Sequence, residues 1–283
     1  MEKRSKVMLP TLFEKMQQRV PITMVTCYDY PMGYLVEQAG VDIVLVGDSL
    51  GMTVLGYEST LPVTMEDMIR HAQAVRRGTP NAFLVGDMPY MSYQVCVEDA
   101  VRNAGRFMAE AACDGVKLEG GAEMADRVHA IARAGIPVMG HLGLTPQSSS
   151  ALGGFKVQGK DAARARRIVD DARLLERTGA FSILLEMVPD RVAGLITGRA
   201  GVPIIGLGSG PQAHGQLLIF HDMFGLYPRF KPKMAKVFGN AGEVILNGLK
   251  AYVTEVQSRE FPSAENWFGM KDDQYEELVR GLE

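Results

Sequence analysis

Four acidic side chains each stand at the end of a short apolar run in the sequence: Asp48, Asp87, Glu119 and Glu186. A single carboxylate in such a place is most simply a helix N-cap, but four of them at four run ends favour a shared site. Carboxylates that converge repel one another unless a cation lies among them. Oxygen ligands without clustered Cys or His favour Mg²⁺ over zinc. The pattern therefore predicts a divalent-metal site that includes Asp48 and Asp87.

Two basic residues belong with these carboxylates. Lys117 lies two residues before Glu119, so on a strand both side chains face the same side and can point into one site. A salt bridge between the two is the alternative interpretation. His141 follows another apolar run, whereas His71 and His129 lie on helical stretches. We therefore expect His141 to belong to the site, with a core histidine as the alternative.

Eight apolar runs supply the strands that would position these residues. Short, continuously apolar runs are typical of strands buried on both faces, as in a parallel sheet. The runs cover residues 22–27, 42–48, 82–88, 115–119, 137–143, 181–186, 203–208 and 216–220. Stretches with apolar residues at helical spacing separate most of them, at 64–78, 98–113, 122–134, 161–178 and 189–200. This alternation predicts an α/β fold, a (β/α)₈ TIM barrel, rather than an open doubly wound sheet. No helix is expected between the last two runs.

Additional helices are expected at both ends of the barrel. A capping-box pattern at Thr11 and Glu14 predicts an extra N-terminal helix that could cover the N-terminal mouth of the barrel. A C-terminal helical extension is expected over about residues 232–283, with helices at 240–258 and 272–282. It is either an outer helix with a tail or an arm that packs on a neighbouring subunit. We expect residues 1–283 to form a single barrel domain.

Composition narrows the classes of function. The 283 residues suit one α/β barrel, and a net charge of −3 gives no electrostatic reason to expect nucleic-acid binding. No apolar stretch approaches the roughly 20 residues of a membrane span, and no signal-peptide run is present. We therefore expect no membrane association and a cytoplasmic location. The cysteines lack metal-ligand spacing, so reduced, buried thiols are expected at Cys27, Cys96 and Cys113.

Loops after the strands are the other places where binding residues are expected. Those over 49–64 and 144–160 are long, and long loops on the catalytic face of a barrel are common sites of lids and substrate contacts. The GLGSG segment over 206–210 is compatible with a phosphate-binding turn or with a tight turn out of a strand.

Several longer blocks of the sequence resemble the ketopantoate hydroxymethyltransferase family. They lie over about residues 20–230 and include VGDSLGM, GVKLEGG, GHLGLTPQS, VPIIGLGSG and HDMFGL. The resemblance implies a (β/α)₈ barrel, commonly assembled as a homodecamer. It implies that Asp48 and Asp87 bind Mg²⁺ directly and that Glu119 helps to hold the metal through water.

The same resemblance assigns the remaining site residues. Ser49, Lys117 and His141 match groups that contact a bound oxo acid, together with the two metal-binding aspartates. Glu186 matches the proposed catalytic base. In the segment PQAHGQ, His214 stands where the resemblance leads us to expect an Asp, and this departure concerns the contacts with folate.

The reaction that the resemblance implies has two small-molecule substrates. A hydroxymethyl group passes from 5,10-methylenetetrahydrofolate to 3-methyl-2-oxobutanoate through a Mg²⁺-stabilised enolate and gives 2-dehydropantoate. The alternative is a Mg²⁺-dependent C–C or P–C lyase of the isocitrate lyase or phosphoenolpyruvate mutase kind. A non-catalytic binding protein on a barrel is a third possibility. Folate dependence separates the first two, and Mg²⁺ binding separates both from the third.

Overall fold

The computed structural model describes residues 4–230 and 232–282, and it divides into two compact units. The first unit runs to Met223 and includes Tyr227–Lys236, and the second contains Phe224–Leu226 and the residues from Val237 onward. The expectation of a single domain over 1–283, with an extension from about 232, stays a prediction. Residues 1–3 and residue 283 of that predicted domain lie outside the residues that the structure describes.

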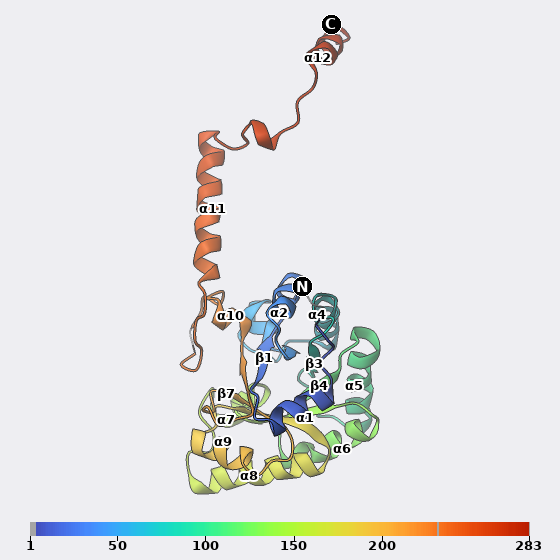
Figure 1. Ribbon diagram of the computed structural model, residues 1–283, viewed down its shortest axis with the longest axis vertical. Helices are drawn as coiled ribbons and strands as arrows, with labels where there is room; N and C mark the ends of the chain where they lie inside the picture. Colours follow the sequence, from blue (N-terminus) through green and yellow to red (C-terminus); the bar gives the residue numbers. More distant parts are fainter. Residues whose placement is uncertain (1–3, 231, 283) are drawn as a thin grey trace. The chain divides into compact units, whose positions relative to one another are not determined.

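The first unit is a closed barrel of eight parallel strands that pair in chain order (Figure 1). Closure comes from β8, which pairs with β1 so that Gly215 lies opposite Ile22. Every strand falls within or overlaps a predicted apolar run, so the TIM-barrel prediction is confirmed. The strands are β1 (Ile22–Thr26), β2 (Ile43–Val46), β3 (Phe83–Asp87), β4 (Gly115–Glu119), β5 (Val138–Gly143), β6 (Ala180–Glu186), β7 (Ile204–Leu207) and β8 (Gly215–Leu218).

Helices follow most strands and cover the outside of the barrel. Those that match predicted stretches are α4 (Met65–Gly78), α5 (Val97–Ala111), α6 (Ala125–Arg133) with the 3₁₀ turn η1 (Ala122–Met124), α8 (Ala162–Arg177) and α9 (Asp190–Thr197). Those that were not predicted are α2 (Tyr30–Gln38), α3 (Leu50–Thr53), α7 (Ser149–Leu152), α10 (Phe220–Met223) and the 3₁₀ turn η2 (Pro146–Ser148). The described segment between β7 and β8 has no helix, as expected. A capping box between Thr64 and Asp67 starts α4.

The N-terminal helix α1 (Leu9–Gln17) covers the N-terminal side of the barrel. Its Leu12 is fully buried in the core cluster that contains Ile22 and Met24 of β1. The helix begins two residues before the predicted start at Thr11, because Pro10 occupies its first turn, where a missing N–H costs nothing. The predicted capping box between Thr11 and Glu14 was therefore wrong.

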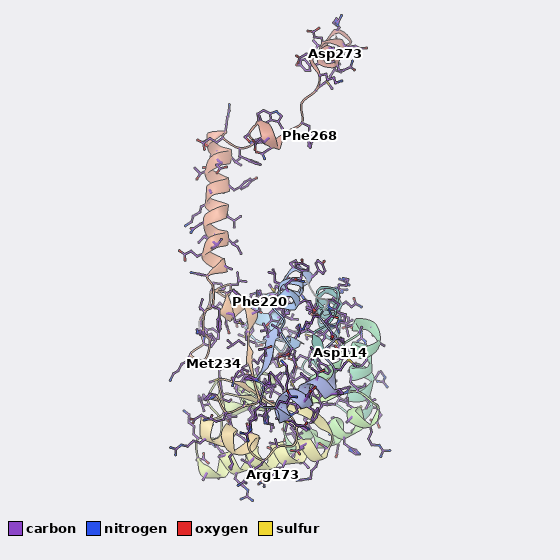
Figure 2. The ribbon with its side chains drawn as sticks, in the orientation of Figure 1. Asp114, Arg173, Phe220, Met234, Phe268 and Asp273 are labelled. Carbon is purple, nitrogen blue, oxygen red and sulfur yellow. The ribbon has the colours of Figure 1, made fainter. Side chains whose placement is uncertain are left out.

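Ion pairs join the N-terminal segment to the starts of the strands. Asp114, labelled in Figure 2, directly precedes β4 and accepts hydrogen bonds from Lys6 Nζ at 2.6 Å and from Arg76 Nη1 at 2.8 Å. Asp42 directly precedes β2 and pairs with Lys15 of α1 at 2.5 Å. These charges lie on the face of a barrel that contributes stability, so the opposite face is left for chemistry.

The second unit is helical. It contains α11 (Ala241–Ser258), the 3₁₀ turn η3 (Ala264–Asn266) and α12 (Asp272–Arg280), which match the helices expected over 240–258 and 272–282. Among the described residues, no helix has both the length and the apolar character that crossing a bilayer requires.

All three cysteines are free thiols, as expected, but they differ in burial. Cys27 and Cys113 are buried, and desolvation raises the pKa of each thiol to about 12. Cys96 precedes α5 and is only partly buried, so the expectation of burial was wrong for this residue.

We expect iodoacetamide at pH 8 to label Cys96 first in the native protein. The reactive form is the thiolate, which burial suppresses at Cys27 and Cys113. Intact-mass spectrometry should show one fast addition in native buffer and three after unfolding in guanidinium chloride. Labelling of Cys27 as fast as that of Cys96 in the native protein would contradict this account.

Candidate active site

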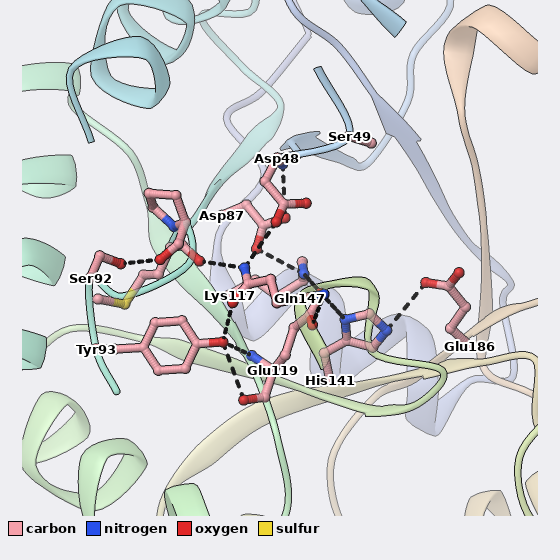
Figure 3. Close-up of polar contacts among 12 residues, drawn as sticks. Asp48, Ser49, Asp87, Ser92, Tyr93, Lys117, Glu119, His141, Gln147 and Glu186 are labelled. Atoms are coloured by element: carbon pink, nitrogen blue, oxygen red, sulfur yellow. Dashed lines mark hydrogen bonds and ion pairs between the residues drawn. The ribbon is translucent and has the colours of Figure 1, made fainter. Parts of the chain in front are cut away.

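Neighbouring strands bring the predicted acidic and basic residues together at the C-terminal end of the barrel (Figure 3). The register places Asp87 of β3 beside Lys117 of β4, and Glu119 of β4 beside His141 of β5. Glu186 ends β6, the next strand around the barrel. None of these groups is more than 8% exposed. We refer to the following six residues as the charge cluster: Asp48, Asp87, Lys117, Glu119, His141 and Glu186.

Lys117 is the positive centre of the charge cluster. Its Nζ lies 2.7 Å from Asp87 Oδ1 and 3.9 Å from Glu119 Oε1. The predicted alternative, a salt bridge between Lys117 and Glu119, is therefore the weaker of its two pairings. Burial opposes the charge on Lys117, but the surrounding carboxylates outweigh it and raise its pKa. The side chain is thus an ammonium ion at neutral pH.

His141 lies between two carboxylates. Its Nδ1 is 3.4 Å from Glu119 Oε1, and its Nε2 is 3.3 Å from Glu186 Oε2. Burial and the charge of Lys117, whose Nζ is 3.2 Å away, both oppose protonation of the ring. The two carboxylates outweigh them and raise the pKa of His141 to about 9. His141 is buried, as a core histidine would be. It differs from a core histidine because its ring is charged and lies among other charged side chains.

Negative charge exceeds positive charge in the cluster, since four carboxylates face two basic groups. Burial, together with the charges of Asp87 and Glu119, raises the pKa of Asp48 well above its usual range. Burial likewise raises the pKa of Asp87, although Lys117 opposes this. Burial would also raise the pKa of Glu119, but His141 and Lys117 lower it. A site with this excess of buried carboxylate oxygen suits a divalent cation such as Mg²⁺.

The carboxylates are not arranged as a finished metal site. Among the described residues, no three Asp, Glu, His or Cys side chains stand in an arrangement that would hold a metal ion. Asp87 is paired with Lys117, and one oxygen of Asp48 accepts a hydrogen bond from Gln147. The donor chemistry therefore fits Mg²⁺, while the assignment of Asp48, Asp87 and Glu119 as metal ligands stays a prediction.

Gln147 of η2 connects the carboxylates of the cluster. Its Nε2 donates to Asp48 Oδ2 and to the carbonyl oxygen of Met88, both at 2.9 Å. Its backbone N–H donates to Glu119 Oε2 at 3.0 Å. The hydroxyl of Tyr93 donates to Gln147 Oε1 at 2.7 Å and accepts from the backbone N–H of Glu119 at 3.1 Å. Every side-chain polar atom of Gln147 is thus used to hold the two acids in place.

The sequence reasoning missed both Gln147 and Tyr93, because neither ends an apolar run. Only their position in the sequence could have indicated that they belong to the site, because each lies in a loop that follows a strand bearing a residue of the charge cluster. Such loops were expected to hold substrate contacts, but nothing in the composition of this one distinguishes Gln147 from the serines beside it.

One cavity of about 270 Å³ contacts all seven predicted site residues, including Ser49. Ser49 lies beside the charge cluster, and its Oγ is 2.8 Å from the hydroxyl of Tyr28. The cavity also extends to the side chains of Phe155, Asp222 and Tyr227.

Two other features of the sequence lie apart from this chemistry. His214 directly precedes β8, and its Nδ1 accepts from the backbone N–H of Ile204 at the start of β7. It is therefore at the N-terminal end of the barrel, so the departure at this position does not bear on folate contacts at the cavity. In the GLGSG segment, Ser209 is buried, and its hydroxyl donates to the carbonyl oxygen of Leu185 and accepts from Val188 N–H. These bonds support the tight-turn interpretation.

Comparison with known proteins connects this geometry to a family. The family described as ketopantoate hydroxymethyltransferase matches residues 6–264. A 3-methyl-2-oxobutanoate hydroxymethyltransferase of Clostridium botulinum (strain 657 / Type Ba4) is 52% identical over 92% of this chain and 95% of its own length. One of Geobacillus sp. (strain WCH70) is 49% identical over 95% of this chain and 96% of its own.

Solved structures with a similar fold are much more distant in sequence. 2,3-Dimethylmalate lyase, a member of the PEP mutase/isocitrate lyase superfamily, has a TM-score of 0.59 at 14% identity, over 99% of this chain and 96% of its own. Phosphonopyruvate hydrolase in complex with oxalate and Mg²⁺ has a TM-score of 0.58 at 12% identity, over 97% of each chain. At these identities the likeness concerns the fold alone.

Replacement of Gln147 by leucine should destabilise the protein. Leucine has a similar size but cannot donate to Asp48 or accept from Tyr93, so buried polar groups lose their partners at a cost of roughly 1–3 kcal/mol. Urea denaturation followed by circular dichroism measures this loss. The matched control is Gln158→Leu, because that side chain bonds only within its own loop and should change stability by less than about 0.5 kcal/mol. Equal losses in the two variants would contradict the role given to Gln147.

Proposed function

Because this chain belongs to the ketopantoate hydroxymethyltransferase family, we propose that it transfers a hydroxymethyl group to 3-methyl-2-oxobutanoate and forms 2-dehydropantoate. Its relatives carry this substrate in their name over nearly the full length of the chain. The observation that carries the proposal is the charge cluster. It lines one cavity at the end of the barrel where enzymes of this fold do their chemistry.

We infer that the one-carbon donor is 5,10-methylenetetrahydrofolate and that the metal is Mg²⁺. Asp48 and Asp87 would bind the metal directly, and Glu119 would hold it through water. Bound there, Mg²⁺ would act as a Lewis acid that stabilises negative charge developing on the 2-oxo oxygen. The excess of buried carboxylate oxygen around Lys117 supports this assignment.

Lys117 and His141 supply the positive charge that the anionic oxo acid requires. Both are buried and protonated at neutral pH, so their attraction for a carboxylate is little screened by solvent. The Ser49 hydroxyl, which lines the same cavity next to Asp48, can donate a further hydrogen bond. Together these groups orient the oxo acid for the steps that follow.

Glu186 is the base in this proposal. Its contact within the charge cluster is with His141, at 3.3 Å, and it does not share Lys117 with the metal-binding acids. Its carboxylate can therefore accept the proton from C3 of the oxo acid. The resulting enolate carbon bonds to the methylene carbon of the folate. That carbon starts out bonded to two folate nitrogens: one of these bonds breaks as the carbon–carbon bond forms, and the other breaks when water supplies the hydroxyl group of the product. The proton taken from C3 and one proton of the water pass to the two nitrogens of the departing tetrahydrofolate.

We also propose that the protein works in the cytoplasm and assembles as a homodecamer, as the resemblance implies. Apolar side chains along α11 support self-association. Val244 is 71% exposed in the single chain, Leu249 57% and Tyr252 55%. Exposed apolar side chains of this number on one helix are typical of protein–protein contacts.

An assay in which each component is omitted in turn tests the function. With the oxo acid, Mg²⁺ and 5,10-methylenetetrahydrofolate all present, we expect 2-dehydropantoate and tetrahydrofolate in equal amounts by chromatography. Without folate, no product should form, but the C3 hydrogen of the oxo acid should still exchange with deuterated solvent. Removal of Mg²⁺ with EDTA should stop both the formation of product and the exchange of the C3 hydrogen. Cleavage of the oxo acid in the presence of Mg²⁺ and without folate would instead favour a lyase.

Glu186→Gln should abolish C3 hydrogen exchange and leave oxo-acid binding within about threefold of wild type. The amide keeps the shape of the side chain but cannot accept the proton, a loss typically worth 10²–10⁴-fold in rate. Proton NMR in deuterated buffer follows the exchange, and calorimetry follows binding. Glu66→Gln, on the exposed surface of α4, is the matched control and should behave as wild type. Normal exchange in Glu186→Gln would reject the assignment of the base.

A further inference from the structure

Asp222 is an acidic residue of the cavity that lies outside the charge cluster. It belongs to α10, directly after β8, and is partly buried against the cavity. Figure 2 labels its neighbour Phe220, whose backbone N–H donates to Thr26 Oγ1 at the end of β1, at 3.0 Å. That bond fixes the corner that carries Asp222. The charge cluster spans β2–β6, so Asp222 approaches the same cavity from the other side of the barrel.

The carboxylate of Asp222 has no hydrogen bond or ion pair with any residue that the structure describes. By contrast, each acid of the charge cluster pairs with Lys117, His141 or Gln147. Partial burial without a partner raises the pKa of Asp222 to about 6. A desolvated carboxylate with free lone pairs is costly, so its oxygens are available to hydrogen-bond donors of a ligand.

The cavity that Asp222 lines has a largely apolar and partly aromatic wall, which also includes the basic side chain of Lys233. Ile219 and Met52 contribute aliphatic surface, and Phe155, Tyr227 and Phe230 contribute rings. Phe155 is 51% exposed and Phe230 52%, so both rings offer open surface to a ligand, and Phe230 packs edge-on against Tyr227 at 5.6 Å between ring centroids. Mainly apolar walls with a small number of placed polar groups are typical of sites that bind small organic ligands, and flat rings stack well on aromatic side chains.

The two substrates of the proposed function differ in how they suit such a wall. The oxo acid is an anion without N–H donors, so Asp222 would repel it. The pterin ring of a tetrahydrofolate is flat, and its 2-amino-4-oxopyrimidine edge presents two adjacent N–H donors. A carboxylate can accept both at once, as it does from the paired donors of a guanidinium group.

We propose that Asp222 binds the 2-amino-4-oxopyrimidine edge of the folate co-substrate, with Phe155, Tyr227 and Phe230 against its ring. This inference rests on the proposed function, since it names the binding residue for the second substrate of that reaction. It places the folate on the β8 side of the cavity and leaves the charge cluster to the oxo acid.

The test uses the full chain with Mg²⁺ and compares wild type with Asp222→Asn, which keeps the size of the side chain but removes the charge and one acceptor. Calorimetry measures the binding of tetrahydrofolate and of its 2-deamino analogue, in which hydrogen replaces the amino group. We expect the Kd of tetrahydrofolate to rise about 10- to 100-fold in Asp222→Asn. The analogue should bind wild type and variant equally weakly. Asp170→Asn, on the exposed face of α8, is the matched control.

Exchange of the C3 hydrogen separates this proposal from the proposed function. Exchange needs no folate, so Asp222→Asn should retain it, which also shows that the variant is folded. Wild-type affinity for tetrahydrofolate in an exchanging variant would overturn the role of Asp222 and leave the function intact. Absence of both exchange and transfer in wild type would instead reject the function. If Asp222→Asn loses exchange, binding to the wild-type protein becomes the test. Equal affinity of the wild type for tetrahydrofolate and for its 2-deamino analogue would then overturn the proposal.

Discussion

Lys117 carries a positive charge that is almost completely buried, and the C-terminal ends of neighbouring strands are arranged around it. A buried ion is tolerated only when opposite charges and hydrogen bonds surround it, so its partners cannot be lost one at a time without a large cost. The pair with Asp87 joins β4 to β3, and the pair between Glu119 and His141 joins β4 to β5. Glu186 continues the series to β6. The same charges that fix the strand ends are thus those that can bind an anionic substrate.

The strands and their terminal residues were predictable from sequence because one physical rule governs both. A strand buried on both faces must be continuously apolar, so the first charged residue marks the point where it reaches the cavity, as at Asp87 and Lys117. Gln147 and Asp222 follow no such rule. Each lies in a short helical turn after a strand. The importance of Gln147 comes from contacts with distant parts of the chain, and that of Asp222 from its place in the cavity. The start of α1 was misplaced for a related reason, since Pro10 fixes a helix start as well as a capping box does.

Fold and reaction are determined by different parts of this molecule. The barrel is shared with lyases and hydrolases at 12–14% identity, so eight strands and their helices do not select a reaction. The family relationship, at about half of all positions, is what selects hydroxymethyl transfer over carbon–carbon bond cleavage. The two reactions place different demands on the part of the cavity that lies beyond the charge cluster. A second substrate needs a second wall, and the apolar surface near β8 is the one that we propose for it.

The pairing of β8 with β1 has a consequence for how the chain folds. The two strands are separated by most of the barrel sequence, so the contact between Ile22 and Gly215 brings a large loop-closure entropy and forms late. Until it forms, the free edges of β1 and β8 expose unpaired N–H and C=O groups that other chains can bind. The interval before closure is therefore when aggregation competes with folding. Substitutions that weaken only this seam should lower the yield of folded protein before they affect the finished enzyme.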